Sequence, residues 1–350
     1  MTRLKIGNYL IENYGRPFII AEVGINHNGD LKKALKMIEV AKAAGADCVK
    51  FQTFKAKELV TDERLAYTYT SQGKKVTESM LKMFERYEFS EEQWKVIRKK
   101  CTKEKIMFLS TPQNETDLIF LKKLGIPAIK IGSDDFTNLP LLKKYASHKL
   151  PLILSCGMAD QTEVKDSLAA AGSSARTPLV LLLCTSQYPT PLQDANILKL
   201  DTLRKCFPDL VLGFSDHTQG VIAATLAVGL GAVVFEKHFT LDNDLPGPDH
   251  WFSENPKTLE HWITSIRAAH IALGSCIIKP TKAEEKMRLL ARRSLATLKA
   301  IAKGERFTPG NTGLKRPGTG LPPKYFNDII GRKATRDLCA DRLIKKGDYL

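Results

Sequence analysis

The chain has 350 residues, of which 43% are hydrophobic, and it carries a formal net charge of +15 at pH 7. Its length suits one large domain with a small second one, and no apolar run reaches the roughly 18 residues needed to span a bilayer. The first nine residues lack the apolar segment of a secretory signal, and the seven cysteines form no CxxC pair. We therefore expect a cytoplasmic protein with reduced thiols and no membrane partner.

Eight short apolar runs, separated by stretches with helical spacing of apolar residues, predict eight parallel strands. Each run ends near a polar, chemically useful residue. This pattern predicts a (β/α)8 barrel over residues 1–275, with an active site at the C-terminal ends of the strands. The predicted strands are residues 18–24, 48–54, 107–112, 128–133, 152–158, 179–186, 210–216 and 233–239.

A long polar insertion, residues 59–88, follows the second predicted strand. Insertions of this size at the C-terminal face of a barrel often contact substrate. Beyond the barrel, residues 276–290 are charged and predict a linker with some helix. Residues 291–350 contain short alternating runs and many turn residues, which predict a small β-rich module. So small a core is weakly stable alone, so we expect the module to pack on another surface.

The positive charge is concentrated at the C-terminal end, where residues 276–350 carry 18 Lys/Arg and 7 Asp/Glu, a net charge of +11. The remaining 275 residues therefore carry +4. A basic module can bind nucleic acid or a membrane surface, or help to hold an anionic small substrate; a solvated basic surface is the simplest alternative. Residues 304–346 contain neither a basic motif interleaved with aromatic residues nor zinc-finger spacing, so nucleic acid is not the expected partner.

His217 and His238 follow two consecutive predicted strands, so their imidazoles should meet at the barrel mouth. Two nitrogen ligands could hold one divalent metal and leave positions open for water or substrate oxygens. Asp216, Glu236 and Asp249 lie nearby and could orient the histidines or move protons. The alternative is that one histidine is only hydrogen-bonded within the barrel.

Lys50 and Lys130 lie inside apolar runs, where a lysine is costly to bury without a partner. Three interpretations remain open: an internal ion pair with a carboxylate such as Glu22, a Schiff-base lysine as in class I aldolases, or a cradle for an anion. Two lysines together with several strand-end hydroxyls favour the anion cradle. These hydroxyls belong to Thr111, Ser133 and Ser155.

Two further residues lie in stiff, proline-containing segments. Tyr188 begins a Tyr-Pro-Thr-Pro loop after the sixth predicted strand and is a candidate for either packing or substrate contact. Arg316 lies in a Lys-Arg-Pro-Gly turn of the C-terminal module. A rigid turn can present a guanidinium for two-pronged recognition of oxygens, although most such arginines are simply exposed.

Taken together, these stretches resemble the sialic acid synthase family, in family order and over nearly the whole chain. The matching segments are Ile19-Ile-Ala-Glu-Val-Gly-Ile-Asn-His-Asn-Gly29, Val49-Lys-Phe-Gln-Thr-Phe54, Leu109-Ser-Thr-Pro112, Lys130-Ile-Gly-Ser133, Leu154-Ser-Cys-Gly-Met158, Cys184-Thr-Ser-Gln-Tyr-Pro189, Ser215-Asp-His-Thr218, Glu236-Lys-His-Phe-Thr240, Pro246-Gly-Pro-Asp-His250 and Lys315-Arg-Pro-Gly-Thr-Gly320.

The resemblance implies a TIM barrel followed by a domain similar to type III antifreeze protein (SAF, β-clip). It also implies a homodimer in which that domain crosses to the partner's barrel. The implied reaction condenses phosphoenolpyruvate with an N-acetylated mannosamine-type aldose, with Mn²⁺ or Mg²⁺, and gives a nine-carbon 2-keto acid and phosphate. N-acetylmannosamine and 2,4-diacetamido-2,4,6-trideoxymannose are the expected sugars, giving sialic or legionaminic acid; a pseudaminic-type precursor is less favoured.

The resemblance also implies residue roles. His217 and His238 resemble the metal ligands, and Glu22 resembles a proton-transfer group. The phosphoenolpyruvate set is Lys50, Thr111, Lys130, Ser133, Ser155 and Ser186; the sugar set is Glu22, Gln52, Tyr188, Asp249 and Arg316; the catalytic carboxylates are Glu22, Asp135, Glu236 and Asp249.

Some positions depart from the family pattern. Asp135 stands where many relatives have glutamate, and Ser186 stands where some have asparagine. Residues 67–83, which should lie near the sugar, align poorly and leave the choice of sugar open. A class I aldolase is the rival enzyme, and a non-catalytic basic binding protein is the rival of another kind. The second does not account for His217, His238 and Lys130 lying together at strand ends.

Overall fold

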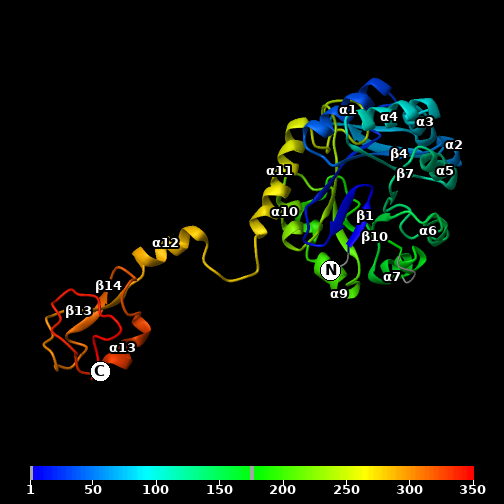
Figure 1. Cartoon of the computed structure of the whole chain (residues 1–350). Coiled ribbons are helices and arrows are strands. Elements are labelled where there is room, and N and C mark those ends of the chain that lie inside the picture. The colour runs from blue at the N-terminus through cyan, green and yellow to red at the C-terminus, as the bar shows by residue number, and fades with distance from the viewer. Residues whose placement is uncertain (1–2, 174–176) are drawn as a thin grey trace. The chain divides into compact units, whose positions relative to one another are not determined.

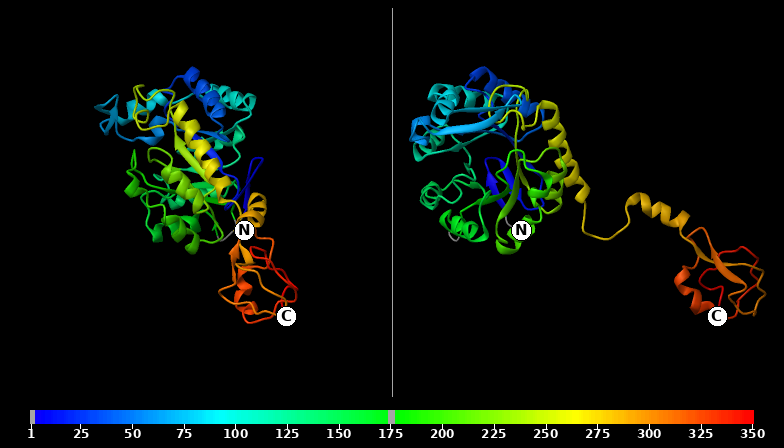
Figure 2. Two further views of the ribbon diagram at one scale, coloured as in Figure 1. Left: turned by 90° about the vertical axis from the view of Figure 1, so that its left-hand side faces the viewer. Right: turned by 180° about the vertical axis from the view of Figure 1, so that it is seen from behind.

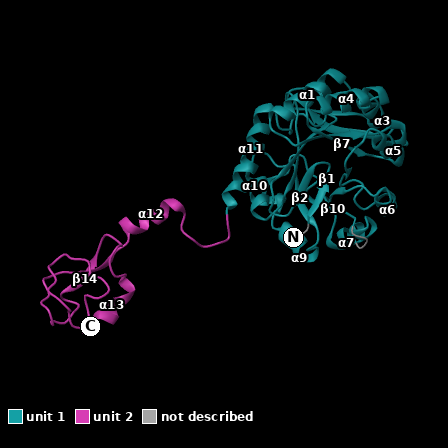
Figure 3. Ribbon diagram, viewed as in Figure 1, with its two compact units in different colours: residues 1–274 teal, residues 275–350 magenta. Residues whose placement is uncertain are grey.

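The computed structural model describes residues 3–173 and 177–350. The chain divides into two compact units, Met1–Gly274 and Ser275–Leu350 (Figure 3). The first unit contains a ring of parallel strands with helices around it (Figures 1 and 2). Within the described ranges, no helix is both long and apolar enough to cross a membrane.

The eight strands pair in parallel, in the order β7-β4-β3-β12-β11-β10-β9-β8. The two strands at the ends of this order, β7 and β8, also contact each other, which brings the sheet round into a barrel. The predicted (β/α)8 fold is therefore confirmed, although β8 is only half as long as its apolar run. The strands are β3 (Phe18–Gly24), β4 (Cys48–Thr53), β7 (Met107–Pro112), β8 (Ile129–Ile131), β9 (Leu152–Ser155), β10 (Leu179–Cys184), β11 (Val211–Asp216) and β12 (Val234–His238).

Helices connect successive strands and cover the outside of the barrel. The first shows why the sequence forms them: the Asp30 side chain accepts hydrogen bonds from the first-turn amides, and Ala34, Met37, Ile38 and Ala41 form one buried face. The helices are α1 (Leu31–Ala43), α4 (Glu91–Lys103), α5 (Glu115–Lys123), α6 (Leu139–Ala146), α7 (Gln161–Ala170), α8 (Leu192–Ala195), α9 (Lys199–Cys206), α10 (Ile222–Gly229) and α11 (Pro256–Leu273).

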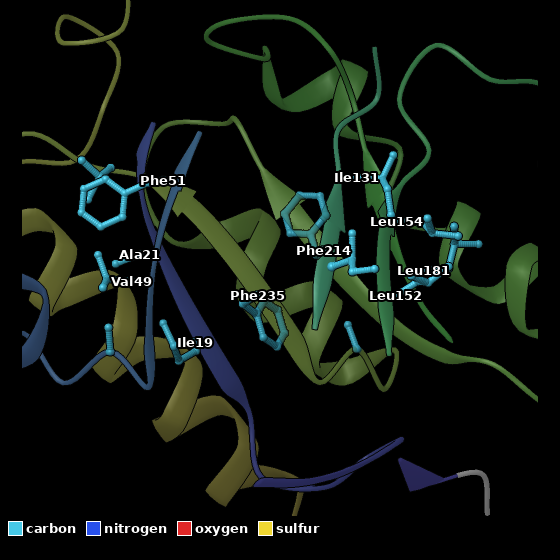
Figure 4. Packing of buried hydrophobic residues seen from close by; sticks show 14 of the residues in the cluster. Ile19, Ala21, Val49, Phe51, Ile131, Leu152, Leu154, Leu181, Phe214 and Phe235 are labelled. Atoms are coloured by element: carbon cyan, nitrogen blue, oxygen red, sulfur yellow. The ribbon is translucent and has the colours of Figure 1, made fainter. Parts of the chain in front are cut away.

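Alternation along the strands divides the barrel core into two layers. The outward-facing layer packs against the helices, and Figure 4 shows part of it, with Ala21 of β3 beside Val49 of β4. The inward-facing layer fills the N-terminal half of the barrel. The hairpin of β1 (Arg3–Ile6) and β2 (Tyr9–Glu12) adds Leu4, Ile6 and Ile11 to that inner layer. The interior is therefore packed at one end and polar at the other.

The polar insertion after β4 is a folded element. It contains α2 (Ala56–Leu59), an antiparallel hairpin of β5 (Ala66–Ser71) and β6 (Lys74–Ser79), and α3 (Met80–Tyr87). Gln72 and Gly73 form the turn with φ values of 50° and 73°, which suit a tight two-residue hairpin connection. The tip is tied to the loop after β12, because Gly247 donates its amide to Ser71 Oγ at 3.0 Å.

The second unit has a small core of its own around Leu295, Phe307 and Ile344. The stretch predicted as a linker with some helix contains α12 (Lys282–Ala291). The remaining elements are β13 (Ser294–Thr297), β14 (Thr312–Lys315), the 3₁₀ turn η2 (Pro323–Tyr325) and α13 (Phe326–Ile329), joined by turns and isolated bridges.

Candidate active site

A cavity of about 790 Å³ opens at the C-terminal ends of the barrel strands. The structure gathers into its wall most of the side chains that the sequence singled out, although they come from all eight strands or the loops after them. The predicted residues that line it are Glu22, Lys50, Gln52, Thr111, Lys130, Ser133, Ser155, Ser186, Tyr188, His217, Glu236, His238 and Asp249.

Two lysines and two glutamates form a buried row across the floor of the cavity. Lys50 Nζ lies 2.8 Å from Glu22 Oε2 and 3.8 Å from Glu236 Oε2. Lys130 Nζ lies 3.7 Å from Glu236 Oε1. None of the four side chains is more than 6% exposed. The predicted internal ion pair is therefore present, and because both lysines also line the cavity, it leaves the predicted anion cradle open.

Burial and the neighbouring charges separate the two carboxyl groups chemically. Burial raises the pKa of Glu22, and the charge of Lys50 only partly offsets this effect. Burial would also raise the pKa of Glu236, but the charges of Lys130 and Lys50 outweigh it and lower that pKa. Glu236 is therefore the more acidic of the two and serves as a counter-charge to the lysines, whereas Glu22 holds a proton more readily.

Hydroxyl groups surround the two lysines. Lys130 donates to Ser155 Oγ at 2.8 Å, and Lys50 donates to Thr111 Oγ1 at 3.2 Å. Ser133 Oγ accepts the amide of Gly157 at 3.0 Å, and the buried Ser186 Oγ has no hydrogen-bond partner among the described residues. Cationic and hydroxyl donors that converge on open space suit a phosphate or carboxylate.

Gly157 lies against the rim of this anion cradle. A Cβ atom added there would collide with the hydroxyl oxygens of Ser186 and Ser133. Glycine therefore leaves the space that both hydroxyls occupy, and any larger residue at this position would displace them.

His217 and His238 lie side by side above the lysine row, with ring centroids 5.6 Å apart. His217 Nδ1 is 2.8 Å from the carbonyl of Thr185, and since a carbonyl can only accept, Nδ1 carries the proton and Nε2 is free. His238 Nδ1 is buried and lacks a hydrogen-bond partner among the described residues. Burial, together with the charge of His217, keeps the pKa of His238 well below its usual value.

This donor set fits a divalent cation. Imidazole nitrogens without hydrogen-bond partners in the protein are good ligands for Mn²⁺ and similar ions. Over the part of the chain that is described, no three His, Cys, Asp or Glu side chains are arranged to hold a metal by themselves. A cation at this place would therefore take most of its ligands from water and substrate oxygens.

Asp249 completes the upper wall of the cavity. Its Oδ2 lies 3.9 Å from His238 Nδ1, and burial, reinforced by the charge of Glu22, raises its pKa to about 7. Tyr188 packs its ring 4.1 Å from that of His217. This end of the cavity therefore offers a titrating carboxyl and an aromatic hydroxyl beside the histidine pair.

Two predicted site residues lie elsewhere. Asp135 is not among the residues that line the cavity, and its carboxylate instead accepts a hydrogen bond from Asn138 at 3.0 Å. The preceding residue, Asp134, lines the cavity in its place. The catalytic role expected for Asp135 stays a prediction. Arg316 lies exposed in the second unit.

The sequence did not single out several other lining residues. Gln113 and Gln187 directly follow predicted strands, so the strand-end rule could have found them. Tyr67, Thr68 and Tyr69 belong to the β5–β6 hairpin; the sequence placed their stretch near the sugar, but its weak family match singled out no residue in it.

Comparisons with known proteins agree with this geometry. Residues 37–278 match the NeuB family and residues 292–350 match the SAF domain. The chain is 42% identical over 327 residues to the N,N'-diacetyllegionaminic acid synthase of Legionella pneumophila, covering 92% of each chain. It is 40% identical over 333 residues to the enzyme of the same name from Campylobacter jejuni, covering 95% of this chain and 99% of that one.

A solved structure adds a likeness in three dimensions. The N-acetylneuraminic acid synthetase of Leptospira borgpetersenii, in complex with citrate, has a TM-score of 0.73 and 31% sequence identity. The match covers 82% of this chain and 95% of that one. By its sequence, its fold and the residues gathered at its barrel mouth, this chain belongs to the NeuB family and carries a SAF domain at its C-terminal end.

Proposed function

We propose that this protein condenses phosphoenolpyruvate with an N-acetylated mannosamine-type aldose, giving a nine-carbon 2-keto sugar acid and phosphate. The observation that carries the proposal is the joint placement of an anion cradle and a histidine pair in one cavity. The cradle suits the phosphate and carboxylate of phosphoenolpyruvate, and the histidine pair suits the aldehyde end of the sugar. The chain's membership of the NeuB family supports the same reaction.

In this reaction C3 of phosphoenolpyruvate attacks the aldehyde carbon, water adds at C2, and phosphate leaves by C–O cleavage. Lys50 and Lys130 hold the anionic substrate, with the hydroxyls of Thr111, Ser133, Ser155 and Ser186 around it. Glu22 is the proposed proton donor to the oxygen that was the aldehyde, because burial raises its pKa and so favours its protonated form. Asp249, with a pKa of about 7, takes a proton from the attacking water. Glu236 keeps both lysines charged.

His217 and His238 would hold a divalent cation, Mn²⁺ or Mg²⁺, beside the sugar. When bound, this ion supplies Lewis acidity to the aldehyde. Gln52, which donates to Glu22 at 3.2 Å, and Tyr188 line the same end of the cavity and are the proposed sugar contacts.

Between the two expected sugars, 2,4-diacetamido-2,4,6-trideoxymannose is the better fit. Apolar side chains from α2 and α3 line the cavity beneath the hairpin, namely Leu59, Val60, Met80, Met83 and Phe84. A 6-deoxy carbon and acetyl methyl groups suit such a wall, whereas hydroxyls there would lose hydrogen bonds to water. Two relatives named N,N'-diacetyllegionaminic acid synthase support the same choice.

The proposed assembly is a homodimer in which residues 291–350 of one chain, after a linker at 276–290, bring Arg316 to the partner's barrel of residues 1–275. The support is the family resemblance and the exposure of Arg316 in its own unit. The proposed compartment is the cytoplasm, since all seven cysteines are free thiols. Arg316→Ala should raise KM for the sugar about tenfold and leave KM for phosphoenolpyruvate unchanged. Full activity of the isolated barrel would contradict the crossed arrangement.

The direct test is phosphate release from phosphoenolpyruvate with Mn²⁺, comparing N-acetylmannosamine with 2,4-diacetamido-2,4,6-trideoxymannose. Cation-dependent release with either sugar supports the reaction, and a higher kcat/KM for the diacetamido sugar supports the finer assignment. No release with both sugars would contradict the proposed function.

A class I aldolase is the second candidate, favoured by one observation. Burial lowers the pKa of Lys130, as it does for lysines that form Schiff bases. Borohydride should trap no adduct on Lys130 in the presence of pyruvate, because Ser155, Ile131 and Glu236 already engage its ammonium. A trapped adduct together with activity in a chelator would favour the aldolase.

A further inference from the structure

A buried group of charges lies directly behind the two cavity histidines, on the outer side of the barrel wall. Asp216 precedes His217 at the end of β11, and Lys237 precedes His238 at the end of β12. Because side chains alternate along a strand, the histidines face the cavity while Asp216 and Lys237 face α11. The two strands are in register at this level, with Asp216 opposite Lys237.

The ammonium of Lys237 makes three contacts at once. Its Nζ lies 3.0 Å from Asp216 Oδ2 and 3.5 Å from Glu254 Oε1, and it also donates to the carbonyl of Thr218. Trp262 of α11 donates its Nε1–H to the same carboxylate oxygen of Asp216 at 2.9 Å. The side chains of Lys237 and Asp216 are 3% and 0% exposed, so water does not screen this group.

Each contact fixes the chain beside one of the histidines. Asp216 Oδ1 accepts both the amide and the hydroxyl of Thr218 at 2.8 Å, so it holds the turn that begins after His217. Glu254 donates its own amide to the carbonyl of His238 at 2.9 Å. Through Asp216, Thr218 and Glu254, one ammonium ties the backbone around His217 to the backbone around His238.

The fold alone does not require charge at this place. The outward-facing positions two residues earlier on the same strands, Phe214 and Phe235, are apolar and pack in the helix-facing layer, and Phe235 packs edge-on against Trp262 at 6.4 Å. A buried ion pair is seldom more stabilising than apolar side chains of similar volume. On these two strands, the outward-facing charges lie at the positions next to His217 and His238. Hydrogen bonds there can fix the distance between the two histidines.

We propose that Lys237 and Asp216 are positioning residues that set the spacing of His217 and His238 for the divalent cation. The inference rests on the proposed function only in that a cation binds between these histidines. Groups behind metal ligands typically change metal affinity by about 10–100-fold when they are replaced. Neither residue touches the substrates in this scheme, since both face away from the cavity.

The test measures Mn²⁺ binding to the substrate-free protein by the loss of the free-ion electron paramagnetic resonance signal. The charge-balanced variant Asp216→Asn/Lys237→Met avoids leaving one buried charge unpaired, and Trp262→Phe removes the indole hydrogen bond while both charges stay in place. We expect Kd for Mn²⁺ to rise at least tenfold in the double variant and about threefold in Trp262→Phe, with both proteins folded by circular dichroism.

The matched control is Asp47→Asn, which disturbs a buried carboxylate at the opposite end of the barrel, where Asp47 pairs with Arg16 at 3.0 Å. It should lower thermal stability and leave Kd for Mn²⁺ within twofold of wild type. Unchanged affinity in folded Asp216→Asn/Lys237→Met would overturn the positioning role; if that variant does not fold, unchanged affinity in Trp262→Phe would do so.

The His217→Ala variant separates this inference from the proposed cation site. Wild-type binding that His217→Ala abolishes, with unchanged affinity in Asp216→Asn/Lys237→Met, would overturn the positioning role alone. Wild-type protein that binds no Mn²⁺, or binding that survives His217→Ala, would overturn the cation site and the positioning role together.

Discussion

The two ends of the barrel both contain buried polar groups, but they differ in whether these groups have hydrogen-bond partners within the protein. At the N-terminal end, the carboxylate of Asp47 pairs with Arg16 and Arg267 and accepts the amide of Ile19 at 3.0 Å. At the C-terminal end, Glu236 Oε2, Ser186 Oγ and His238 Nδ1 are buried without hydrogen-bond partners among the described residues.

This difference separates stability from function within one fold. A buried polar atom without a partner costs free energy, so a set of them at one place indicates groups kept available for a ligand. Both oxygens of the Asp47 carboxylate have partners within the protein and need no ligand.

Replacing a cavity histidine should cause the largest loss. His217→Ala removes one imidazole from the proposed cation site, and we expect kcat/KM to fall about 1,000-fold, equivalent to about 4 kcal/mol. The thermal midpoint should change little, because His217 faces the cavity. Phosphate release measures the effect, and the exposed His261 on α11 provides the matched control. Comparable activity in His217→Ala and His261→Ala would contradict the assignment.

Adding a methyl group at Gly157, beside Ser133 and Ser186, should have the next largest effect, a rise in KM for phosphoenolpyruvate. In Gly157→Ala the new methyl group displaces the hydroxyls of Ser133 and Ser186, so KM for phosphoenolpyruvate should rise about 100-fold. Gly229→Ala is the control, because a Cβ atom at this position in α10 meets no atom within 4 Å. Steady-state kinetics at saturating sugar distinguish the two variants. A normal KM in Gly157→Ala would place the phosphate away from these two serines.

Replacing Asp47 at the N-terminal end should lower stability and leave activity nearly unchanged. Asp47→Asn weakens the pairs with Arg16 and Arg267, and we expect it to lower the free energy of unfolding by about 2 kcal/mol. Below its unfolding temperature, kcat/KM should remain within twofold of wild type. Tryptophan fluorescence reports this unit alone, because all three tryptophans lie in residues 1–274. A large loss of activity without loss of stability would remove the distinction between the ends.

The smallest expected effect is a loss in the free energy of unfolding at low pH, caused by His27 in the loop after β3. Burial lowers the pKa of His27 to about 3, so the unfolded chain binds a proton on this residue below about pH 6.5 while the folded chain does not. Its contribution to stability is complete above pH 6.5 and falls by about 1.4 kcal/mol for each unit below it.

Aspartates with raised pKa values, such as Asp117 at about 7, act in the opposite direction, so the effect of His27 is measured as a difference. Relative to wild type, His27→Gln should gain about 1.4 kcal/mol in free energy of unfolding between pH 6 and pH 5. Between pH 7.5 and pH 8.5 the difference should stay constant. A difference that does not vary with pH would show that His27 is protonated in the folded protein.

The sequence predicts the barrel well because buried parallel strands are continuous apolar runs, and it places the strand-end residues because these positions meet at one face. Asp135 shows what this reasoning cannot reach: after the bend at Ser133, Asp134 lines the cavity and Asp135 does not. After a strand ends, a shift of one residue decides which side chain faces the cavity, and the local sequence does not show that shift.

For the β5–β6 hairpin and the group behind the histidines, the sequence indicated a stretch near the sugar and one member, Asp216, but not their contacts, and the reason is different. The hairpin strands are largely exposed and depend on contacts such as that between Ser71 and Gly247, 176 residues apart. Lys237 lies in a recognisable motif, but its partners Asp216, Glu254 and Trp262 come from other elements. Such networks exist only once the barrel has closed.

The hairpin of β1 and β2 packs with the inner layer and closes the N-terminal end of the barrel, so the cavity opens at the C-terminal end. Lys130 and Ser155 lie at its floor, whereas Tyr188 near its rim is 44% exposed. A molecule bound at the floor must therefore arrive before the one that sits above it. After the reaction the two products must leave in the opposite order, so the product bound at the floor is released last.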